Sequence, residues 1–558
     1  MFKYYLIIMA GVFLLFLYNS IMYRKNTLEK LRKKIRQAWG APQNREYEYT
    51  EMIKIANLFQ KKKDGKFYID DITWNDLDMD SIFMLLNNTY SSAGEEYLYA
   101  MLRIPEFRED NLIERNKLIE SFEENEEEVF KLQEVFAKLG RTKSISLSEF
   151  IDRFSGLGKR SNIKHYILDI LLIVSVAMLF VKPIIGIVSF IVMISVNIGT
   201  YYQEKAKIES YFTCLKYLVD MINCGYALEK IQCNNESKKY ISVVSEDLKK
   251  LKSVSKGMFW ISINGNGGSI AEIIMEYIRM LFHVDIIKFN SILEATNNNL
   301  DTIEELFDTF GMLESCMAVA SFRKMAIYSC KPQFENSIHI SADEIYHPMI
   351  AEPVSNSINE TRSVVITGSN ASGKSTFLKT VAINSILAQT VYTCTARRFN
   401  TNFYKTYTSM ALRDDLMNNE SYYIVEIKSI KRILDAVSEN IPVLCFVDEV
   451  LRGTNTVERI AASTHILKRL SEENVMCFAA THDIELTTIL ENYYSNYHFT
   501  EEVSDDDVLF SYKLLRGRAT SRNAIKLLKI IGFDNNIISN AECMAGDFVN
   551  NGLWNKIP

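Results

Sequence analysis

No part of this sequence limits the fold more than residues 363–376, which read SVVITGSNASGKST. A β-branched run (Val364 to Thr367) precedes a loop from Gly368 to Ser375, and an apolar sequence with helical spacing follows. In this order of strand, glycine-bearing loop and helix, backbone N–H groups and a helix N-terminus face phosphate oxygens. The stretch therefore predicts a P-loop in an α/β domain, and a chance match is the weaker reading once both flanks are counted.

The loop and the first helical turn supply the predicted nucleotide ligands. Lys374 is expected to reach the β- and γ-phosphates, and the Ser375 hydroxyl is expected to ligate Mg²⁺. The predicted cofactors are ATP and Mg²⁺. The predicted nucleotide-binding residues in this stretch are Gly368, Ser369, Asn370, Ala371, Ser372, Gly373, Lys374, Ser375 and Thr376.

Two further apolar runs end in residues suited to phosphate chemistry. Residues 443–447 precede Asp448 and Glu449, and residues 475–480 precede a Thr-His pair that ends at His482. Such runs are typical of buried parallel strands. Asp448 is predicted to hold Mg²⁺ through its water shell, Glu449 to take a proton from the attacking water, and His482 to sense the γ-phosphate or orient that water. Taken alone, His482 is as consistent with a structural role as with a functional one. The predicted catalytic residues are Lys374, Glu449 and His482, and the predicted metal ligands are Ser375 and Asp448.

Two regions are apolar enough to cross a membrane. Tyr4 to Met22 carries no charge over about the ~20 residues that a span needs, and basic residues follow it instead of preceding it. That charge order predicts an uncleaved anchor and not a secretory signal peptide. A second apolar region, Tyr166 to Tyr201, is divided by Lys182-Pro183 and predicts a helical hairpin. The alternative is a pair of buried helices in a soluble core.

The charges that flank these segments predict the topology. By the positive-inside rule the N-terminus lies outside, and both ends of the hairpin lie in the cytosol. The expected location is the plasma membrane, with several crossings and a cytosolic ATPase domain. The cysteines all follow the hairpin, as suits a reducing compartment. The predicted α+β organisation is a transmembrane anchor (1–22), a cytosolic helical domain (23–163), a transmembrane hairpin (164–202), a second helical part (203–330) and a P-loop ATPase domain (331–558).

Composition excludes two functional classes. With 48% hydrophobic and 24% charged residues, the chain is not intrinsically disordered. A net charge of −6 and a pI near 5.9 exclude tight, nonspecific polyanion binding, so any contact with DNA needs a local basic patch.

The motifs, in their order and spacing, resemble those of the MutS family. GSNASGKST resembles its Walker A motif, FVDEVLRGTNT its Walker B motif and AATHDIELT its switch-histidine segment. Segments such as IYHPMI and YKLLRGRATSRNAIKLLKIIGF extend the resemblance over about residues 330–545. Residues 73–105 resemble the family's helical core, and residues 290–334 resemble its lever helix.

The resemblance implies a dimeric ATPase with composite sites and a C-terminal helical dimerisation segment. Ser421, in NNESYYIVE, matches the serine that reaches the nucleotide of the other subunit. In a monomer, Ser421 would instead be an exposed helix cap. The family's mismatch-reading and connector domains have no room before the helical core, and the hairpin falls at about the position of the family's DNA clamp.

The predicted function is a membrane-anchored MutS-like ATPase that converts ATP and water to ADP and phosphate and couples this reaction to DNA binding. The expected partners are a second copy of the chain, the lipid bilayer, DNA and unidentified proteins. The alternative is a nucleotide-switched membrane scaffold that binds proteins rather than DNA. A transporter motor is a third reading, disfavoured because no LSGGQ-type signature lies between the Walker motifs.

Overall fold

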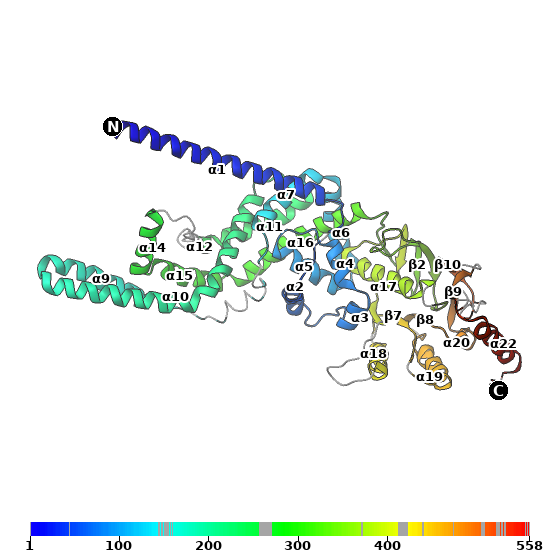
Figure 1. Ribbon diagram of the computed structural model, residues 1–558. Helices are drawn as coiled ribbons and strands as arrows, with labels where there is room; N and C mark the ends of the chain where they lie inside the picture. The colour runs from blue at the N-terminus through cyan, green and yellow to red at the C-terminus, as the bar shows by residue number, and fades with distance from the viewer. Residues whose placement is uncertain are drawn as a thin grey trace. The chain divides into compact units, whose positions relative to one another are not determined.

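The computed structural model forms two compact units, described separately below (Figure 1). The helical unit comprises Met1–Gly65, Leu86–Met101 and Glu114–Met325, and the α/β unit comprises Lys66–Leu85, Leu102–Ile113 and Ala326–Pro558. The structure describes the chain except residues 1, 44, 143–145, 147–148, 150–155, 157, 159, 256–269, 370–371, 411–421, 438–439, 453, 473, 504–507, 520–524, 526–527, 529–531, 553, 555 and 557–558.

The helical unit is built from long helices, of which α5 and α6 extend by a few residues into segments of the other unit. Its helices are α1 (Phe2–Ala38), α2 (Tyr49–Lys62), α5 (Ser92–Arg103), α6 (Glu109–Glu124), α7 (Glu126–Leu139), α9 (Ile163–Val181), α10 (Pro183–Leu228), α11 (Asn235–Lys250), α12 (Lys252–Ser255), α14 (Ile270–Phe282), α15 (Val284–Asn297) and α16 (Leu300–Met325).

Helices α5 and α16 approach each other closely through two glycines. A Cβ added to Gly94 of α5 would lie 2.8 Å from Glu314 Cβ, and one added to Gly311 of α16 would lie 2.4 Å from Tyr97 Cβ. Each helix therefore offers a glycine to a large side chain of the other. This reciprocal packing buries Glu314 to 1% exposure, where its carboxylate accepts hydrogen bonds from the Tyr90 and Ser91 backbone N–H groups and from the Ser91 hydroxyl.

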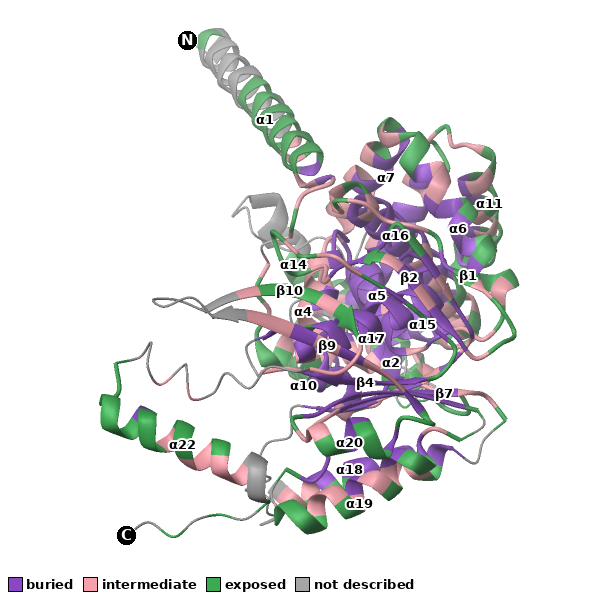
Figure 2. Cartoon of the chain, turned by 90° about the vertical axis from the view of Figure 1, so that its right-hand side faces the viewer, coloured by how far each residue is buried: buried purple, intermediate pink, exposed green. Residues whose placement is uncertain are grey.

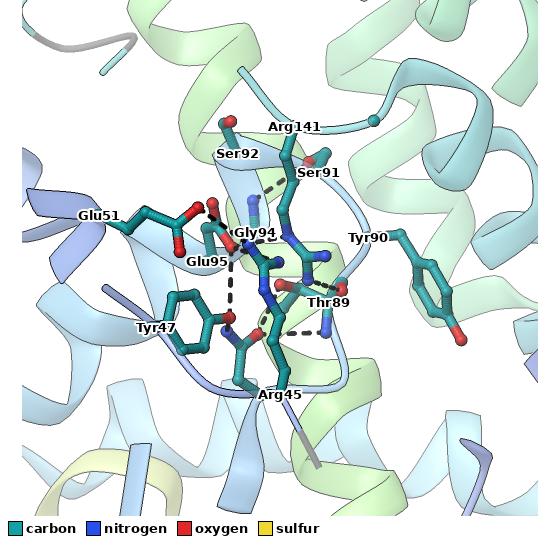
Figure 3. A network of polar contacts seen from close by, with 12 residues as sticks. Arg45, Tyr47, Glu51, Thr89, Tyr90, Ser91, Ser92, Gly94, Glu95 and Arg141 are labelled. Atoms are coloured by element: carbon teal, nitrogen blue, oxygen red, sulfur yellow. Dashed lines mark hydrogen bonds and ion pairs between the residues drawn. The ribbon is translucent and has the colours of Figure 1, made fainter. Parts of the chain in front are cut away.

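A second buried carboxylate, Glu95, joins segments that are distant in the sequence (Figure 3). Arg45 and Arg141 both point at it, at 3.4 and 2.6 Å, and the Tyr47 hydroxyl lies 3.5 Å away. Arg141 also donates to the Thr89 carbonyl. Because two guanidinium groups offset its charge, this glutamate can remain in a protein interior.

Helices α9 and α10 form an antiparallel hairpin with Pro183 in the first turn of α10. Ile163–Val181 and Pro183–Glu209 are long and apolar enough to span a membrane, by length and composition alone, and only 17% of each apolar window is buried. Apolar side chains such as Ile170, Ile184 and Ile191 are more than half exposed. The Tyr4–Met22 segment lies within the continuous helix α1.

The α/β unit contains two sheets and the helices around them. Its elements are α3 (Asp71–Asp76), α4 (Met79–Leu86), β1 (Gln333–Phe334), β2 (Ile340–Ile345), β3 (Asn356–Glu360), β4 (Ser363–Thr367), α17 (Lys374–Val391), β5 (Arg398–Thr401), β6 (Lys405–Ser409), α18 (Tyr422–Ala436), β7 (Val443–Asp448), α19 (Thr456–Arg469), β8 (Val475–Ala480), α20 (Ile484–Ile489), β9 (Tyr494–Val503), β10 (Val508–Arg516) and α22 (Asn535–Asn551).

The larger sheet has the strand order β10-β9-β4-β8-β7-β6, with every pair parallel except β9 and β10. Figure 2 shows α17 on one side of this sheet and α18, α19 and α20 on the other. Strands β4 and β8 are buried throughout, as their apolar runs predict. The predicted parallel strands at residues 443–447 and 475–480 are confirmed. The smaller sheet has the order β1-β5-β2-β3.

The units differ from the domains expected from the sequence: the four segments expected over residues 1–330 fall largely in one helical unit, and the last part of the α/β unit begins at Ala326 and not at 331. Lys66–Leu85 and Leu102–Ile113 belong to the α/β unit, although the sequence analysis assigns them to the helical domain 23–163. The reason is side-chain pairing: the buried Asp76 carboxylate accepts from the Thr408 hydroxyl at 2.7 Å and from the Met410 backbone N–H at 2.9 Å. Helix α3 is thereby fixed to the end of β6.

Candidate functional site

Three adjacent parallel strands bring the predicted site residues to one edge of the larger sheet. Strand β8 lies between β4 and β7, with Val364 beside Phe478 and Asp448 beside Ala480. Because carboxyl ends of neighbouring parallel strands meet at the same edge, the segments that follow them meet there too. The P-loop, the Asp448-Glu449 pair and His482 therefore converge, although they are far apart in the chain.

The loop after β4 has backbone φ angles that favour glycine at two positions. Gly368 and Gly373 have φ values of 144° and 106°, which side chains other than glycine rarely adopt. A Cβ on Gly368 would also lie 2.8 Å from the Ser372 hydroxyl. Helix α17 begins at Lys374, directly after the loop. The loop thus leads directly into a helix N-terminus, the arrangement in which P-loops hold phosphates.

The side chain of Lys374, the first residue of α17, turns back into this loop, and the residue is 1% exposed. Its Nζ donates to the Gly368 and Ser369 carbonyls at 2.6 and 2.8 Å and lies 3.3 Å from His482 Nε2. Burial lowers the pKa of Lys374 to about 8, although neighbouring carboxylates, Asp448 first among them, act to raise it. The lysine is thus positioned where phosphate oxygens would replace the carbonyls.

The predicted metal ligands are in direct contact. The Ser375 hydroxyl donates to an Asp448 carboxylate oxygen. Burial raises the pKa of Asp448, so a nearby cation would favour its ionised form. A hydroxyl and a carboxylate are hard oxygen ligands of the kind that Mg²⁺ prefers. The residues present therefore fit a magnesium ion.

Glu449 is held between an imidazole and a guanidinium group. Its Oε1 lies 3.0 Å from His482 Nε2, and its Oε2 lies 3.0 Å from Arg452 Nε. The hydrogen bond with His482 is the largest cause of a lowered Glu449 pKa. Because one imidazole nitrogen cannot donate to Glu449 and accept from Lys374 at the same time, His482 Nε2 has two alternative partners. A cavity of about 240 Å³ opens beside Glu449, His482 and Arg452.

A second cavity beside the P-loop has no counterpart in the sequence predictions. It measures about 310 Å³ and opens next to Gly373 and the first turns of α17. Aromatic rings line it, and burial lowers the pKa of the His347 imidazole in its wall to about 4, so that ring is neutral near pH 7. Its ring-bearing residues are Tyr346, His347, Phe377, Phe499 and Tyr512. This is a suitable site for the base of a nucleotide whose phosphates lie in the loop.

The structure brings most predicted site residues together. Gly368, Ser369, Ser372, Gly373, Lys374, Ser375 and Thr376 lie in or next to the loop, and Asp448, Glu449 and His482 face it. Three predicted residues, Asn370, Ala371 and Ser421, lie outside the described residues. The sequence analysis missed Arg452 and Glu501; the Glu501 carboxylate accepts from the Ser369 hydroxyl at 2.7 Å. The aromatic residues of IYHPMI and of the segment that begins YKLL line one cavity, which the sequence analysis did not predict.

The fold and this edge of the sheet have the arrangement of a P-loop α/β domain. Residues 364–548 match the family model of MutS domain V. Over 359 residues the chain is 28% identical to the DNA mismatch repair protein MSH3 of Debaryomyces hansenii, covering 58% of this chain and 34% of that protein. Over 275 residues it is 29% identical to the DNA mismatch repair protein MutS of Thermotoga maritima, covering 47% and 34%.

A third relative is the MutS protein homolog 4 of Mus musculus, 29% identical over 265 residues, which cover 44% of this chain and 27% of that protein. The chain spans about a third of the length of these relatives, or less. The domain match and the relatives show that this chain is similar to proteins of the MutS family, with the family model covering residues 364–548.

Proposed function

We propose that this protein is an ATPase that binds ATP with Mg²⁺ and hydrolyses it at the edge of the larger sheet. One observation carries the proposal: three different segments converge, with His482 within hydrogen-bonding reach of Lys374 and Glu449, and Asp448 accepting from Ser375 beside Lys374. A phosphate ligand, a metal ligand and a base beside a P-loop are the parts that phosphoryl transfer to water requires.

The proposed chemistry assigns each step to a side chain. Lys374 and the loop N–H groups hold the phosphates, and Ser375 and Asp448 would hold Mg²⁺, which supplies positive charge to the phosphate oxygens when bound. Glu449 takes a proton from water as the water oxygen bonds to the γ-phosphorus. The bond from the γ-phosphorus to the bridging oxygen breaks, and ADP and phosphate leave. The lowered pKa of Glu449 keeps it ionised to accept that proton.

Steady-state hydrolysis by the detergent-purified full chain tests this proposal. Phosphate release should require Mg²⁺ and should fall to background in Glu449→Ala, with fluorescent ATP analogue binding retained. Glu458→Ala, an exposed glutamate in the next helix, is the matched control and should hydrolyse ATP normally. Equal turnover in the Glu449 variant and the wild type would contradict the assigned base.

A dimer with composite sites is the second element of the proposal, supported by the family resemblance around Ser421. If Ser421 acts on the nucleotide of the other subunit, Lys374→Ala and Ser421→Ala damage different halves of one site. Mixing the two inactive variants should then restore part of the turnover, because each mixed dimer contains one intact site. Mixtures that stay inactive while exchanging subunits would contradict this arrangement.

Membrane anchoring is the third element, and the ends of the apolar segments support it. At the base of the hairpin, the exposed rings of Tyr166 and Tyr202 are within a few residues of a cluster of charges in which Arg160, Lys164 and Lys207 surround Glu204 at 3.2–3.8 Å. In α1, Tyr18 and Tyr23 are exposed just before the basic run. Tyrosines followed by cations are typical of a membrane–water interface.

Thiol labelling of intact cells tests the proposed plasma-membrane topology, with the N-terminus outside and the ATPase domain in the cytosol. Lys182→Cys places a thiol at the hairpin turn, and Lys239→Cys places one on the exposed face of α11. An impermeant reagent should label the first in intact cells and the second only after permeabilisation. Labelling of both only after permeabilisation would favour helices that do not cross the bilayer.

Coupling to DNA is proposed from the relatives, whose names describe DNA mismatch repair. The same hydrolysis assay, repeated with single-stranded, duplex, mismatched and branched DNA, tests it. Stimulation by one form would identify the substrate. Hydrolysis unaffected by any of them would contradict the coupling and favour the nucleotide-switched scaffold that binds proteins.

A further inference from the structure

The turn that follows β7 has an unusual backbone for residues with side chains. Glu449 and Leu451 have φ values of 59° and 57°, in the left-handed region. Residues other than glycine rarely adopt this conformation, so the surrounding structure must hold the turn in place. The turn matters because it carries both Glu449 and Arg452, which contact each other.

Neighbouring elements hold the backbone groups of this turn. The Glu449 N–H donates to the Ala480 carbonyl of β8 at 2.9 Å, and the Val450 carbonyl accepts from the Ser463 hydroxyl of α19 at 3.2 Å. The next two N–H groups, at Leu451 and Arg452, both donate to one oxygen, Oε1 of Glu426, the second at 3.3 Å.

Glu426 lies on α18, and its two hydrogen bonds to this turn account for a carboxylate at a buried position. It is 2% exposed, and its second oxygen, Oε2, has no hydrogen-bond partner within the described part of the chain. Ile430 and Ile433 of the same helix belong to the apolar cluster that contains Val450 and Leu451. Burying a carboxylate with one unpartnered oxygen costs free energy of folding. The two hydrogen bonds that Glu426 accepts therefore indicate a role for this residue.

We propose that Glu426 is a positioning residue for the catalytic base: it fixes the Leu451 and Arg452 N–H groups so that Arg452 and His482 hold the Glu449 carboxylate between them. This inference rests on the proposed ATPase function. Glu426 does not touch the reacting atoms. It acts as a backbone acceptor, and its charge is not essential to that role, because a neutral amide oxygen accepts the same two hydrogen bonds.

Two substitutions separate these roles. Glu426→Gln keeps an acceptor oxygen at the same place and should retain kcat within about threefold. Glu426→Ala leaves two N–H groups unpaired and should lower kcat at least ~10-fold, with KM for ATP within about threefold, because the base is displaced and the phosphate ligands are not. Glu458→Ala serves again as the control for loss of a glutamate.

The comparison of the two variants distinguishes positioning from a general loss of structure, because rescue of kcat by Glu426→Gln and an unchanged KM for ATP would not follow from unfolding. Wild-type kcat in Glu426→Ala would overturn the proposal. Equal losses in Gln and Ala variants would also overturn it, because the charge would then be the essential feature.

Hydrogen exchange tests the inference independently of turnover. In full-length protein, a peptide that covers residues 449–456 should exchange at least ~10-fold faster in Glu426→Ala than in Glu426→Gln, with peptides from β4 unchanged. If the wild type hydrolysed no ATP, the proposed function would fail, yet this exchange result would still decide whether Glu426 holds the turn. Identical exchange in both variants would overturn the inference.

Discussion

Two regions of the molecule, the packed helices around Glu314 and Glu95 and the P-loop edge of the larger sheet, hold polar groups in different ways. In the helical unit, Glu314 and Glu95 are enclosed between helices, and each satisfies fixed partners from distant segments. In the α/β unit, Lys374 and His482 lie at the open edge of a sheet, where each has more than one acceptor or donor in reach. The first arrangement stabilises a fold; the second leaves side chains that can change partners when a ligand arrives. Substitutions in the two units should therefore affect different properties.

Lys374→Ala should produce the largest effect. It removes the cation inside the phosphate cradle, so we expect loss of measurable binding of a fluorescent ATP analogue, with the thermal unfolding midpoint of the helical unit unchanged. Ser372→Ala, which removes only a loop hydroxyl, is a milder control for damage to the loop. Wild-type affinity in Lys374→Ala would contradict the proposed role of Lys374 in binding the phosphates.

Glu449→Ala should lower kcat at least ~100-fold and preserve nucleotide binding, because the base acts in the chemical step. Single-turnover hydrolysis and analogue titration measure the two quantities separately. Parallel losses of affinity and turnover would show that Glu449 supports the site instead of acting as its base.

Glu314→Ala should test the enclosed arrangement. It leaves the Tyr90 and Ser91 N–H groups without their acceptor, and we expect a free energy of unfolding lower by roughly 2–4 kcal/mol, with nucleotide affinity unchanged. Calorimetric unfolding in detergent measures the first and analogue titration the second. A large change in affinity would mean that the two kinds of buried polar group are not separate in function.

The same glutamate predicts a pH dependence of stability. Burial raises the pKa of Glu314 from 4.5 to about 7, so the folded chain binds this proton more tightly than the unfolded chain. The stabilisation is complete below about pH 4.5 and is lost as pH rises through 7. Glu314→Gln is neutral at every pH and should lack this part of the decline between pH 5 and 8 in unfolding scans; identical slopes would contradict the assignment.

In the α/β unit, nucleotide affinity should depend on pH through Lys374. Because the pKa of Lys374 is lowered to about 8, the cation is present below that pH and is lost above it. Affinity for the ATP analogue should fall by at most about tenfold per pH unit above 8. Lys374→Arg keeps its charge and should show a flatter profile over the same range, measured by titration at pH 7, 8 and 9.

Gly311→Ala should give the smallest effect of the set. Its new methyl group would lie 2.4 Å from Tyr97 Cβ, so α5 and α16 must move apart, at a cost of typically 1–3 kcal/mol. Gly546→Ala, in α22 with no atom of the described residues within 4 Å of its Cβ position, is the matched control. Equal unfolding midpoints for both variants would show that the helices tolerate a wider spacing.

Local sequence was enough to locate strands β4, β7 and β8 and the residues that follow them. Each motif is contiguous, and the rule that parallel strands align their carboxyl ends brings the motifs together. The aromatic cavity was not predictable in the same way, because His347 and Tyr512 lie on opposite sides of the P-loop in the sequence and meet only in the folded unit.

The contact between Glu426 and the turn after β7 escaped the sequence analysis for a related reason. The glutamate lies 25 residues before Leu451, on a helix whose apolar stripe predicts only packing. A single charged residue on such a helix is usually exposed to solvent, so only its burial shows that it accepts backbone hydrogen bonds. The assignment of residues 66–85 to the α/β unit likewise depends on contacts between residues distant in the sequence, among them that of the buried Asp76 carboxylate with Thr408.

Helix α10 has a mechanical consequence. It runs without interruption for 46 residues, about 69 Å, from the exposed apolar hairpin to the part that packs on α7 and α11. No proline follows Pro183 within it. A single rod of this kind does not bend freely at its middle, so a bilayer that fixed the tilt of its apolar half would also set the tilt of its buried half. Membrane thickness and curvature would then act directly on the packing of the helical unit.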